Sequence, residues 1–437
     1  RAIPHVMDGL KPSHRKILFA CFKRKLHSEI KVAQLAGYTS EHAAYHHGEM
    51  SLNNSIINMA QNYVGSNNIN LLEPNGQFGT RLMGGKDAAS PRYVFTQLSP
   101  MAELLFHPAD APLYQHLEDD GQKIEPSNYV PVLPMLLVNG SNGIGTGWSS
   151  IIPSFNPVDI MDRLEGMLDG KQPERMVPWF KGFQGTVTHI DGTDKFAVVG
   201  VYRWKAATTL HITELPVGTW TNGYKEFLER SVDGGGAFKK GDVISIKCNH
   251  TDTKVDFTVK VSTECATKLR ASGLEKAFKL VTNIGIGNMH AFDASGKLKK
   301  YTTELHILHE FFVERRQLYE KRKTHMCTVL TDTCTRLEQK IKFIGLVVSG
   351  AFAFAGKRKQ QLVDEFTKHN FVPGANEYLL NMPMWNLTQD KKDALDSELE
   401  EKTAQLTLLQ NTSPENLWRQ DLAALKQKLQ LCSKRKR

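Results

Sequence analysis

Tyr93 is the residue of this sequence best suited to covalent chemistry, because it directly follows Arg92 in the segment Ser-Pro-Arg-Tyr. A tyrosine hydroxyl has a pKa of about 10, so its attack on a phosphodiester needs a cation that stabilises the phenolate and the transition state. Arg92 supplies one, and the cluster His46-His47-Gly-Glu carries further polar groups. A phosphotyrosyl ester would conserve the phosphate ester bond and make the reaction reversible. A packed aromatic beside an arginine is the commoner alternative, and these residues alone leave it open.

The first 31 residues carry an excess of positive charge, with eight Lys and Arg against two Asp and Glu. The whole chain has 55 Lys and Arg against 46 Asp and Glu, and a net charge of +9. Such an excess attracts polyanions, of which nucleic acid is one. The run also fits a solvated helix face, and charge alone does not decide between the two readings.

Residues 140–147, Gly-Ser-Asn-Gly-Ile-Gly-Thr-Gly, follow an apolar stretch and look like a nucleotide-binding loop. A loop that cradles phosphates opens directly into a helix. Here Trp148 and Pro153 follow instead, and the glycine spacing does not match GxGxxG. The sequence therefore argues against dinucleotide binding at this loop.

Composition excludes several other classes of protein. With 41% hydrophobic and 23% charged residues, the chain has the composition of a globular protein. The longest apolar runs, Val132–Val138 and Phe343–Val348, are far shorter than the roughly 20 residues of a membrane-spanning helix. Its six cysteines are scattered, which favours a reducing compartment over a disulfide framework.

Potential metal ligands do not gather in this sequence. The histidines His42, His46 and His47 have no cysteine or carboxylate partners at the spacing of a zinc site. The acidic run that begins at Glu118 is isolated and typical of a surface. We therefore expect these residues to hold no metal.

Three regions that differ in residue composition and hydrophobic pattern predict a multidomain α+β protein. In the first, residues 1–121, helices are predicted from Pro12, over Val32–Leu35 and over Ser51–Tyr63. Short β-prone pieces punctuated by glycine and asparagine come next. Helices followed by such a hairpin predict a winged helix-turn-helix domain.

The second region, residues 122–301, has a mixed α/β pattern. Val130–Val138 is predicted as a buried strand and Val158–Leu168 as an amphipathic helix. Alternating apolar residues predict further strands within the segments Gly185–Val201, Thr208–Glu214 and Val255–Val261.

The third region, residues 302–437, is rich in helix formers. Apolar residues at helical spacing form one stripe over about forty residues, with Leu330, Leu337 and Ile344 at intervals of seven. This pattern predicts a coiled-coil arm, and a helix buried in a bundle fits it equally well. Gly350–Asn376 interrupts the pattern, Gln389–Leu409 predicts a return helix, and Ser413 with Pro414 begins a further one.

Several long motifs in a fixed order resemble the breakage-and-rejoining region of eukaryotic DNA topoisomerase II, a type IIA enzyme. They cover nearly the whole chain and include RAIPHVMDGLKPSHRK at 1–16, AYHHGE at 44–49, GGKDAASPRY at 84–93, LLVNGSNGIGTGW at 136–148, TELP at 213–216 and YLLNMPMWNLT at 378–388. The bacterial gyrase A subunit shares the opening pattern. The double histidine and the GIGTGW segment favour the eukaryotic branch.

The resemblance implies a role for each matching residue. Tyr93 corresponds to the nucleophile that joins the DNA 5′ end, Arg92 to the transition-state stabiliser, and His47 to a group beside the cleaved phosphate. Ile144 corresponds to a wedge that bends the duplex by entering between base pairs; a buried isoleucine in a glycine turn is the alternative. The other implied DNA contacts are Arg1, Lys11, Arg15, Tyr45, His46, Ser51, Trp220, Lys276 and Lys279.

The implied architecture is a winged-helix domain with the tyrosine at 1–121, an α/β tower domain that binds DNA at 122–301, and a coiled-coil arm with a helical dimer gate at 302–437. One tyrosine cuts one strand, so a transient double-strand break that lets another duplex pass requires a homodimer. The resemblance places Mg²⁺ in an acidic Toprim module and ATP in a further module. Both are expected upstream of the position of Arg1 and not within this sequence.

Two other functions remain open. A non-catalytic winged-helix architectural protein would use the same basic segment and the same Ile144 wedge. A gyrase-like activity that adds supercoils is expected less, because no DNA-wrapping domain follows Arg437. The resemblance implies a nuclear location, with an organellar form as the alternative; the basic end Ser433–Arg437 fits a nuclear signal or a helix end. Met50 resembles a position that touches topoisomerase poisons.

Overall fold

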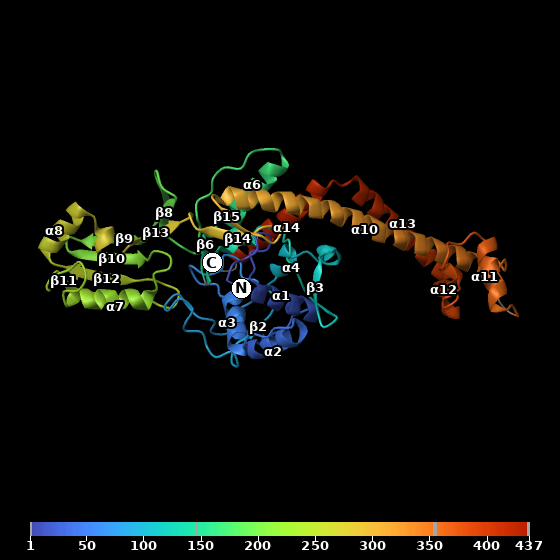
Figure 1. Ribbon diagram of the computed structural model, residues 1–437, viewed down its shortest axis with the longest axis horizontal. Coiled ribbons are helices and arrows are strands. Elements are labelled where there is room, and N and C mark those ends of the chain that lie inside the picture. Colours follow the sequence, from blue (N-terminus) through green and yellow to red (C-terminus); the bar gives the residue numbers. More distant parts are fainter. Residues whose placement is uncertain (1, 146, 353–355, 435–437) are drawn as a thin grey trace. The chain divides into compact units, whose positions relative to one another are not determined.

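The computed structural model describes residues 2–145, 147–352 and 356–434 and divides the chain into two compact units (Figure 1). The first unit comprises Arg1–Arg315 with Arg419–Arg437, and the second comprises Arg316–Trp418. Within the described residues, no helix is both long enough and apolar enough to cross a membrane.

Three helices near the N-terminus build a small core in the first unit: α1 (Pro12–Arg24), α2 (Val32–His42) and α3 (Glu49–Ala60). Pro12 stands in the first turn of α1, where its missing N–H costs no hydrogen bond. The three predicted helices are confirmed, and α2 continues to His42, well beyond its predicted end. Ile17 and Leu52 are among the fully buried residues of this core.

A short pair of strands and several small elements complete this part of the unit. Strand β1 (Ile30–Lys31) pairs with β2 (Phe95–Thr96) and connects the helices to the segment that carries Tyr93. The following elements are α4 (Ala102–Leu105), η1 (Pro108–Leu113), β3 (His116–Asp119) and β4 (Gln122–Pro126).

The predicted strand at Val130–Val138 is wrong. This stretch ends in a short helix, α5 (Met135–Asn139), whose first four residues are buried. Pro131 and Pro134 lack the N–H that a strand contributes to a ladder, and a buried apolar run has no period that separates strand from helix.

Residues 141–145 of the glycine-rich segment form one strand of a β-hairpin and not a nucleotide-binding turn. Strand β5 (Ser141–Gly145) pairs antiparallel with β6 (Trp148–Ile152). Strand β6 packs beside the hairpin of β14 (Met289–Phe292) and β15 (Leu298–Tyr301), where Ser150 Oγ donates to the His290 carbonyl at 2.6 Å. The predicted amphipathic helix follows as α6 (Pro157–Leu168).

Two sheets occupy the middle of the chain. The first has the order β11-β12-β10-β9, made of β9 (Val201–Ala206), β10 (Thr209–Glu214), β11 (Val243–Cys248) and β12 (Phe257–Val261). Helices α7 (Thr221–Val232), α8 (Thr263–Ser272) and α9 (Leu274–Ala277) share its apolar core (Figure 1). The second sheet, β13-β8-β7, consists of β7 (Thr186–Ile190), β8 (Lys195–Val199) and β13 (Val281–Gly285). These strands confirm the predicted α/β pattern, but β11, β13 and nearly all of β9 lie outside the segments that were predicted as strands.

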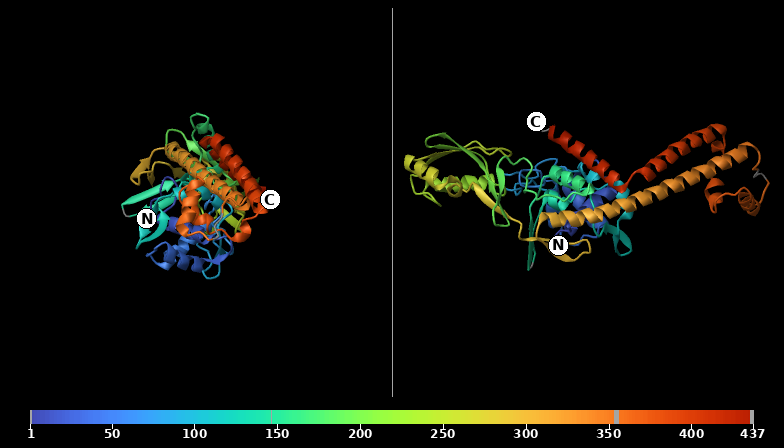
Figure 2. Two further views of the ribbon diagram at one scale, coloured as in Figure 1. Left: turned by 90° about the vertical axis from the view of Figure 1, so that its right-hand side faces the viewer. Right: turned by 90° about the horizontal axis from the view of Figure 1, so that it is seen from above.

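The long helix predicted after residue 302 is confirmed as α10 (Glu304–Val348), and the return helix as α13 (Gln389–Asn411). In the second unit α13 runs antiparallel beside α10 (Figure 2), where Leu337 and Ile344 pack against Leu395. Two residues of the seven-spaced stripe therefore pack within one chain. The segment between α10 and α13 contains three small elements, α11 (Lys359–Lys368), α12 (Ala375–Leu379) and η2 (Met384–Asn386). Ser413 Oγ caps α14 (Pro414–Lys434) as predicted.

Candidate nucleic-acid interface

Tyr93 lies at the surface with 75% of its area exposed. Its backbone is held by the first turn of α2: the amide of Val32 donates to the Val94 carbonyl at 3.1 Å, and the amide of Ala33 to the Pro91 carbonyl at 3.2 Å. The first amides of a helix have no partner inside it, so α2 binds both carbonyls that flank Arg92 and Tyr93. This arrangement fixes the backbone and leaves the phenol and the exposed Arg92 side chain facing solvent.

The histidine cluster lies between α2 and α3. His46 and His47 are exposed, and His46 Nε2 lies 3.8 Å from a carboxylate oxygen of Asp119. Tyr45 is only 8% exposed, and its hydroxyl donates to the His47 carbonyl at 3.1 Å. Tyr45 is thus placed to orient its histidine neighbour, whereas the resemblance implied a direct DNA contact.

Two further residues of this region face solvent at the start of α3. Ser51 is exposed, and Met50 is 78% exposed. Both side chains are accessible to a ligand in this structure.

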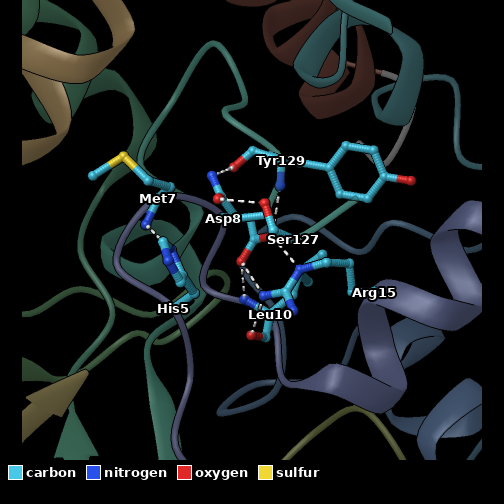
Figure 3. Close-up of polar contacts among 8 residues, drawn as sticks. His5, Met7, Asp8, Leu10, Arg15, Ser127 and Tyr129 are labelled. Carbon is cyan, nitrogen blue, oxygen red and sulfur yellow. Dashed lines mark hydrogen bonds and ion pairs between the residues drawn. The ribbon is translucent and has the colours of Figure 1, made fainter. Parts of the chain in front are cut away.

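Arg15 is buried and faces Asp8, not solvent (Figure 3). Its Nε and Nη2 lie 2.8 and 3.1 Å from the two Asp8 carboxylate oxygens, and Nη2 also donates to the Leu10 carbonyl at 3.1 Å. The same carboxylate accepts the amides of Leu10 and Tyr129. Burial alone would lower the pKa of Arg15, but the Asp8 carboxylate raises it.

The Arg15 guanidinium is therefore not open to solvent, as the expected contact with a phosphate would require. A cation paired this closely in the interior fixes the backbone of residues 8–15 and has little capacity left for DNA. Arg1, the other arginine expected at the phosphate, lies outside the described residues.

Lys11 connects α1 to the β5–β6 hairpin, since its Nζ donates to the Asn142 carbonyl at 2.9 Å. Burial lowers the pKa of Lys11. The same residue lines a cavity of about 480 Å³ together with His14, Asn58, Asn67 and Asn139. Burial, with Lys11 and Arg15 nearby, lowers the pKa of His14 to about 4.

Ile144 stands near the tip of the β5–β6 hairpin with 85% of its area exposed. This exposure excludes the alternative of a buried isoleucine. Gly143 beside it has no room for a side chain, because a Cβ there would lie 2.0 Å from the Ala2 carbonyl oxygen. Trp148, opposite Gly145 in the hairpin, is 53% exposed and packs its ring edge-on to His290 at 5.4 Å. The sequence did not single out Trp148 as an exposed aromatic.

The three remaining expected contacts belong to the middle of the chain. Trp220 is half-buried and packs edge-on against Tyr63 at 5.8 Å. Lys276 and Lys279 are exposed, and Lys279 Nζ lies 4.5 Å from the centre of the Phe227 ring. The two lysines present their positive charge to solvent, whereas Trp220 mainly packs within the protein.

Comparison with known proteins gives this geometry its context. The family model of the DNA gyrase/topoisomerase IV A subunit matches residues 1–423. The chain belongs to this family. It is 43% identical to DNA topoisomerase 2-alpha of Gallus gallus over 98% of this chain and 29% of that protein. It is 40% identical to DNA topoisomerase 2 of Candida albicans over 97% of this chain and 33% of that protein.

A solved structure agrees with these relatives. The Plasmodium falciparum topoisomerase II DNA-binding, cleavage and re-ligation domain matches with a TM-score of 0.92 at 40% identity, over 99% of this chain and 62% of that one. The resemblance to eukaryotic DNA topoisomerase II is thereby confirmed. The chain spans about a third or less of the curated relatives named here.

The residues that the structure describes were compared with the ligand sets of metal sites. Among the described residues, no three His, Cys, Asp or Glu side chains come together as ligands. Asp87, a carboxylate close in sequence to Tyr93, accepts hydrogen bonds from the Thr80 amide and hydroxyl. The Mg²⁺ that the family resemblance implies therefore finds no complete ligand set in the part of the chain that the structure describes.

Proposed function

We propose that this chain is the DNA cleavage and religation core of a type IIA topoisomerase. The observation that carries the proposal is the presentation of Tyr93: its phenol is exposed while two α2 amides hold the carbonyls on either side of it. A nucleophile must be accessible and fixed at once, because small displacements of reacting groups are costly. A packed structural tyrosine would not expose its phenol in this way.

The proposed reaction is a reversible transesterification. The Tyr93 hydroxyl loses its proton as its oxygen forms a bond to a backbone phosphorus. The bond from phosphorus to the 3′ oxygen breaks, and the 3′ oxygen takes up a proton, so the number of protons is unchanged. The product is a 5′-phosphotyrosyl ester, and attack by the 3′ hydroxyl reverses it. Arg92 would stabilise the charge that develops on the phosphate, and His47 would contact the same group.

The wider DNA contacts follow the exposed cationic and apolar groups. Lys276 and Lys279 would bind the backbone without reading sequence, and Ile144 would bend the duplex by unstacking one step. In this proposal residues 1–121 form a winged-helix domain, 122–301 a tower domain, and 302–437 a coiled-coil arm with a dimer gate. Cleavage of both strands then requires two chains. Met384 and Trp385, 76% and 79% exposed in the second unit, support self-association there.

The proposed activity also needs Mg²⁺ and ATP. Mg²⁺ and ATP would be bound by parts of the full-length protein outside these residues, and the cycle of cleavage, duplex passage and religation would relax and decatenate DNA. We place the protein in the nucleus, with an organellar form as the alternative. The exposed Met50 would contact a topoisomerase poison at the cleavage site.

The decisive experiment is to incubate the full-length protein with DNA and Mg²⁺, denature it, and measure DNA covalently attached to protein. We expect Tyr93→Phe to abolish the adduct and leave DNA affinity unchanged. Tyr38→Phe, at a partly buried tyrosine of α2, is the matched control and should form the adduct normally. An adduct that persists in Tyr93→Phe excludes Tyr93 as the nucleophile. DNA bending without any adduct in the wild type would instead establish the architectural alternative.

A further inference from the structure

The loop that precedes Tyr93, residues 78–90, is attached to helix α7. The amide of Thr221 donates to the Arg81 carbonyl at 3.3 Å, and the amide of Asn222 to the Leu82 carbonyl at 3.0 Å. These amides belong to the first turn of α7 and have no acceptor within the helix. The loop therefore caps α7, much as the carbonyls beside Tyr93 cap α2.

A buried ion pair strengthens this attachment. Arg81 Nη2 lies 2.5 Å from Glu214 Oε1, and the two side chains are 7% and 3% exposed. Glu214 ends strand β10, and its carboxylate also accepts the amides of Leu215 at 2.9 Å and Gln184 at 3.3 Å. Removal of one charge from such a pair leaves the other buried without compensation.

Close packing adds a third connection. A Cβ at Gly84, whose φ is +62°, would lie 2.3 Å from the indole ring of Trp220. A Cβ at Gly85 would lie 2.4 Å from Gln61 Nε2, which itself donates to the Phe78 carbonyl at 2.9 Å. The double glycine thus lets the loop seat directly on α7 and on the end of α3.

Hydrogen bonds inside the loop connect this docking point to Tyr93. Asp87 accepts from both the amide and the hydroxyl of Thr80, at 2.9 and 2.5 Å. The amide of Ala89 donates to the Gln77 carbonyl at 2.9 Å. These hydrogen bonds join the two sides of the loop. The loop and the Tyr93 segment that follows it are therefore expected to move together.

We propose that Arg81 and Glu214 are positioning residues, which couple the DNA-binding α/β module of α7 and β10 to the placement of Tyr93. This inference rests on the proposed cleavage function. Neither side chain has to touch DNA: when the module binds and bends a duplex, the docked loop keeps the Tyr93 segment in register with the bound backbone. Loss of the pair leaves DNA binding intact and misplaces the nucleophile.

The test is Glu214→Gln in the full-length protein, assayed at a temperature where all variants are folded. At saturating DNA we expect the rate of covalent adduct formation to fall by roughly tenfold or more, since a 1 Å misplacement is worth up to about a hundredfold. The DNA concentration for half-saturation and the extent of bending should stay unchanged. Equal adduct rates in Glu214→Gln and wild type would overturn the proposal.

Two further variants separate positioning from mere stability. The double variant Arg81→Met with Glu214→Gln leaves no charge buried, and the new amide oxygen can still accept the Leu215 and Gln184 amides. It should regain the thermal midpoint that Glu214→Gln alone loses, while its adduct rate stays low. If the rate recovers together with the midpoint, the pair is only structural and the inference fails. Asp110→Asn, in a fully buried pair with Arg315, is the matched control: it should lose stability and form the adduct at the normal rate.

The wild-type result separates the proposed function from the positioning role. A wild-type protein that forms no Tyr93-dependent adduct overturns the proposed function and this inference with it. Normal wild-type adduct with an unaffected Glu214→Gln overturns this inference alone.

Discussion

The hydroxyl of the buried Tyr45 donates a hydrogen bond to the backbone carbonyl of His47, whose own side chain is exposed. The two rings also meet edge-on with centroids 5.5 Å apart. An exposed histidine on a loop would otherwise sample several orientations. This contact fixes the backbone from which His47 reaches toward solvent.

Tyr45→Phe tests whether this contact matters for cleavage. The substitution keeps the ring and removes one hydrogen bond, so we expect a stability loss of about 1 kcal/mol and a several-fold slower adduct formation. Adduct yield and thermal unfolding of the full-length protein measure the two effects. A variant as fast as wild type would show that the hydroxyl has no part in placing His47.

Arg92→Ala should separate chemistry from folding. The side chain is exposed, so the thermal midpoint should stay within about 1 °C of wild type, in keeping with small surface effects. Loss of a charge that stabilises the transition state should slow cleavage by roughly a hundredfold to a thousandfold. Arg230→Ala, at an exposed arginine of α7, is the matched control. Comparable slowing in both variants would argue for a general charge effect on DNA binding.

Ile144→Ala should reduce DNA bending with little effect on folding, because the side chain is 85% exposed. Unstacking a base step costs a few kcal/mol, and without the apolar wedge the bent fraction should fall by roughly tenfold. Energy transfer between dyes at the two ends of a short duplex measures the bend. Ile244→Ala, at a 52% exposed isoleucine of β11, should bend DNA normally. Undiminished bending by Ile144→Ala would remove the wedge assignment.

Because the pKa of His14 is lowered in the fold, we expect the free energy of unfolding to decrease at acidic pH. Its pKa is about 6.5 in an unfolded chain and is lowered to about 4 in the fold, by burial and by Lys11 and Arg15. The unfolded state therefore binds the extra proton first, and stability is lost as the pH falls from about 6.5 toward 4, by at most roughly 3 kcal/mol.

The variant His14→Gln removes this titration. Its stability relative to wild type should rise as the pH drops from 7.5 to 5, when both proteins are compared by thermal unfolding. A constant difference between His14→Gln and wild type across this range would contradict the lowered pKa.

Local patterns predicted most of the elements. Pro12 predicted the start of α1, and the apolar stripe after residue 302 predicted α10 from one strong helical period; both helices are present. The prediction failed at Val130–Val138, where apolar residues occupy nearly every position and no period exists. The packing partner of α10 also had to come from the structure, since Leu337 meets Leu395 across nearly sixty residues of chain.

The candidate site, like the fold, was predicted from the sequence only in part. Residue types and order determined the candidates: a tyrosine beside an arginine, a basic N-terminal run, and an isoleucine between glycines. Which of these side chains reach solvent was decided only by tertiary structure, because burial depends on contacts with residues far away in sequence. Arg15 turns inward to Asp8, which also accepts the amide of Tyr129, whereas Tyr93 remains exposed. The pairing of Arg81 with Glu214 spans 133 positions, and no local pattern carries such a contact.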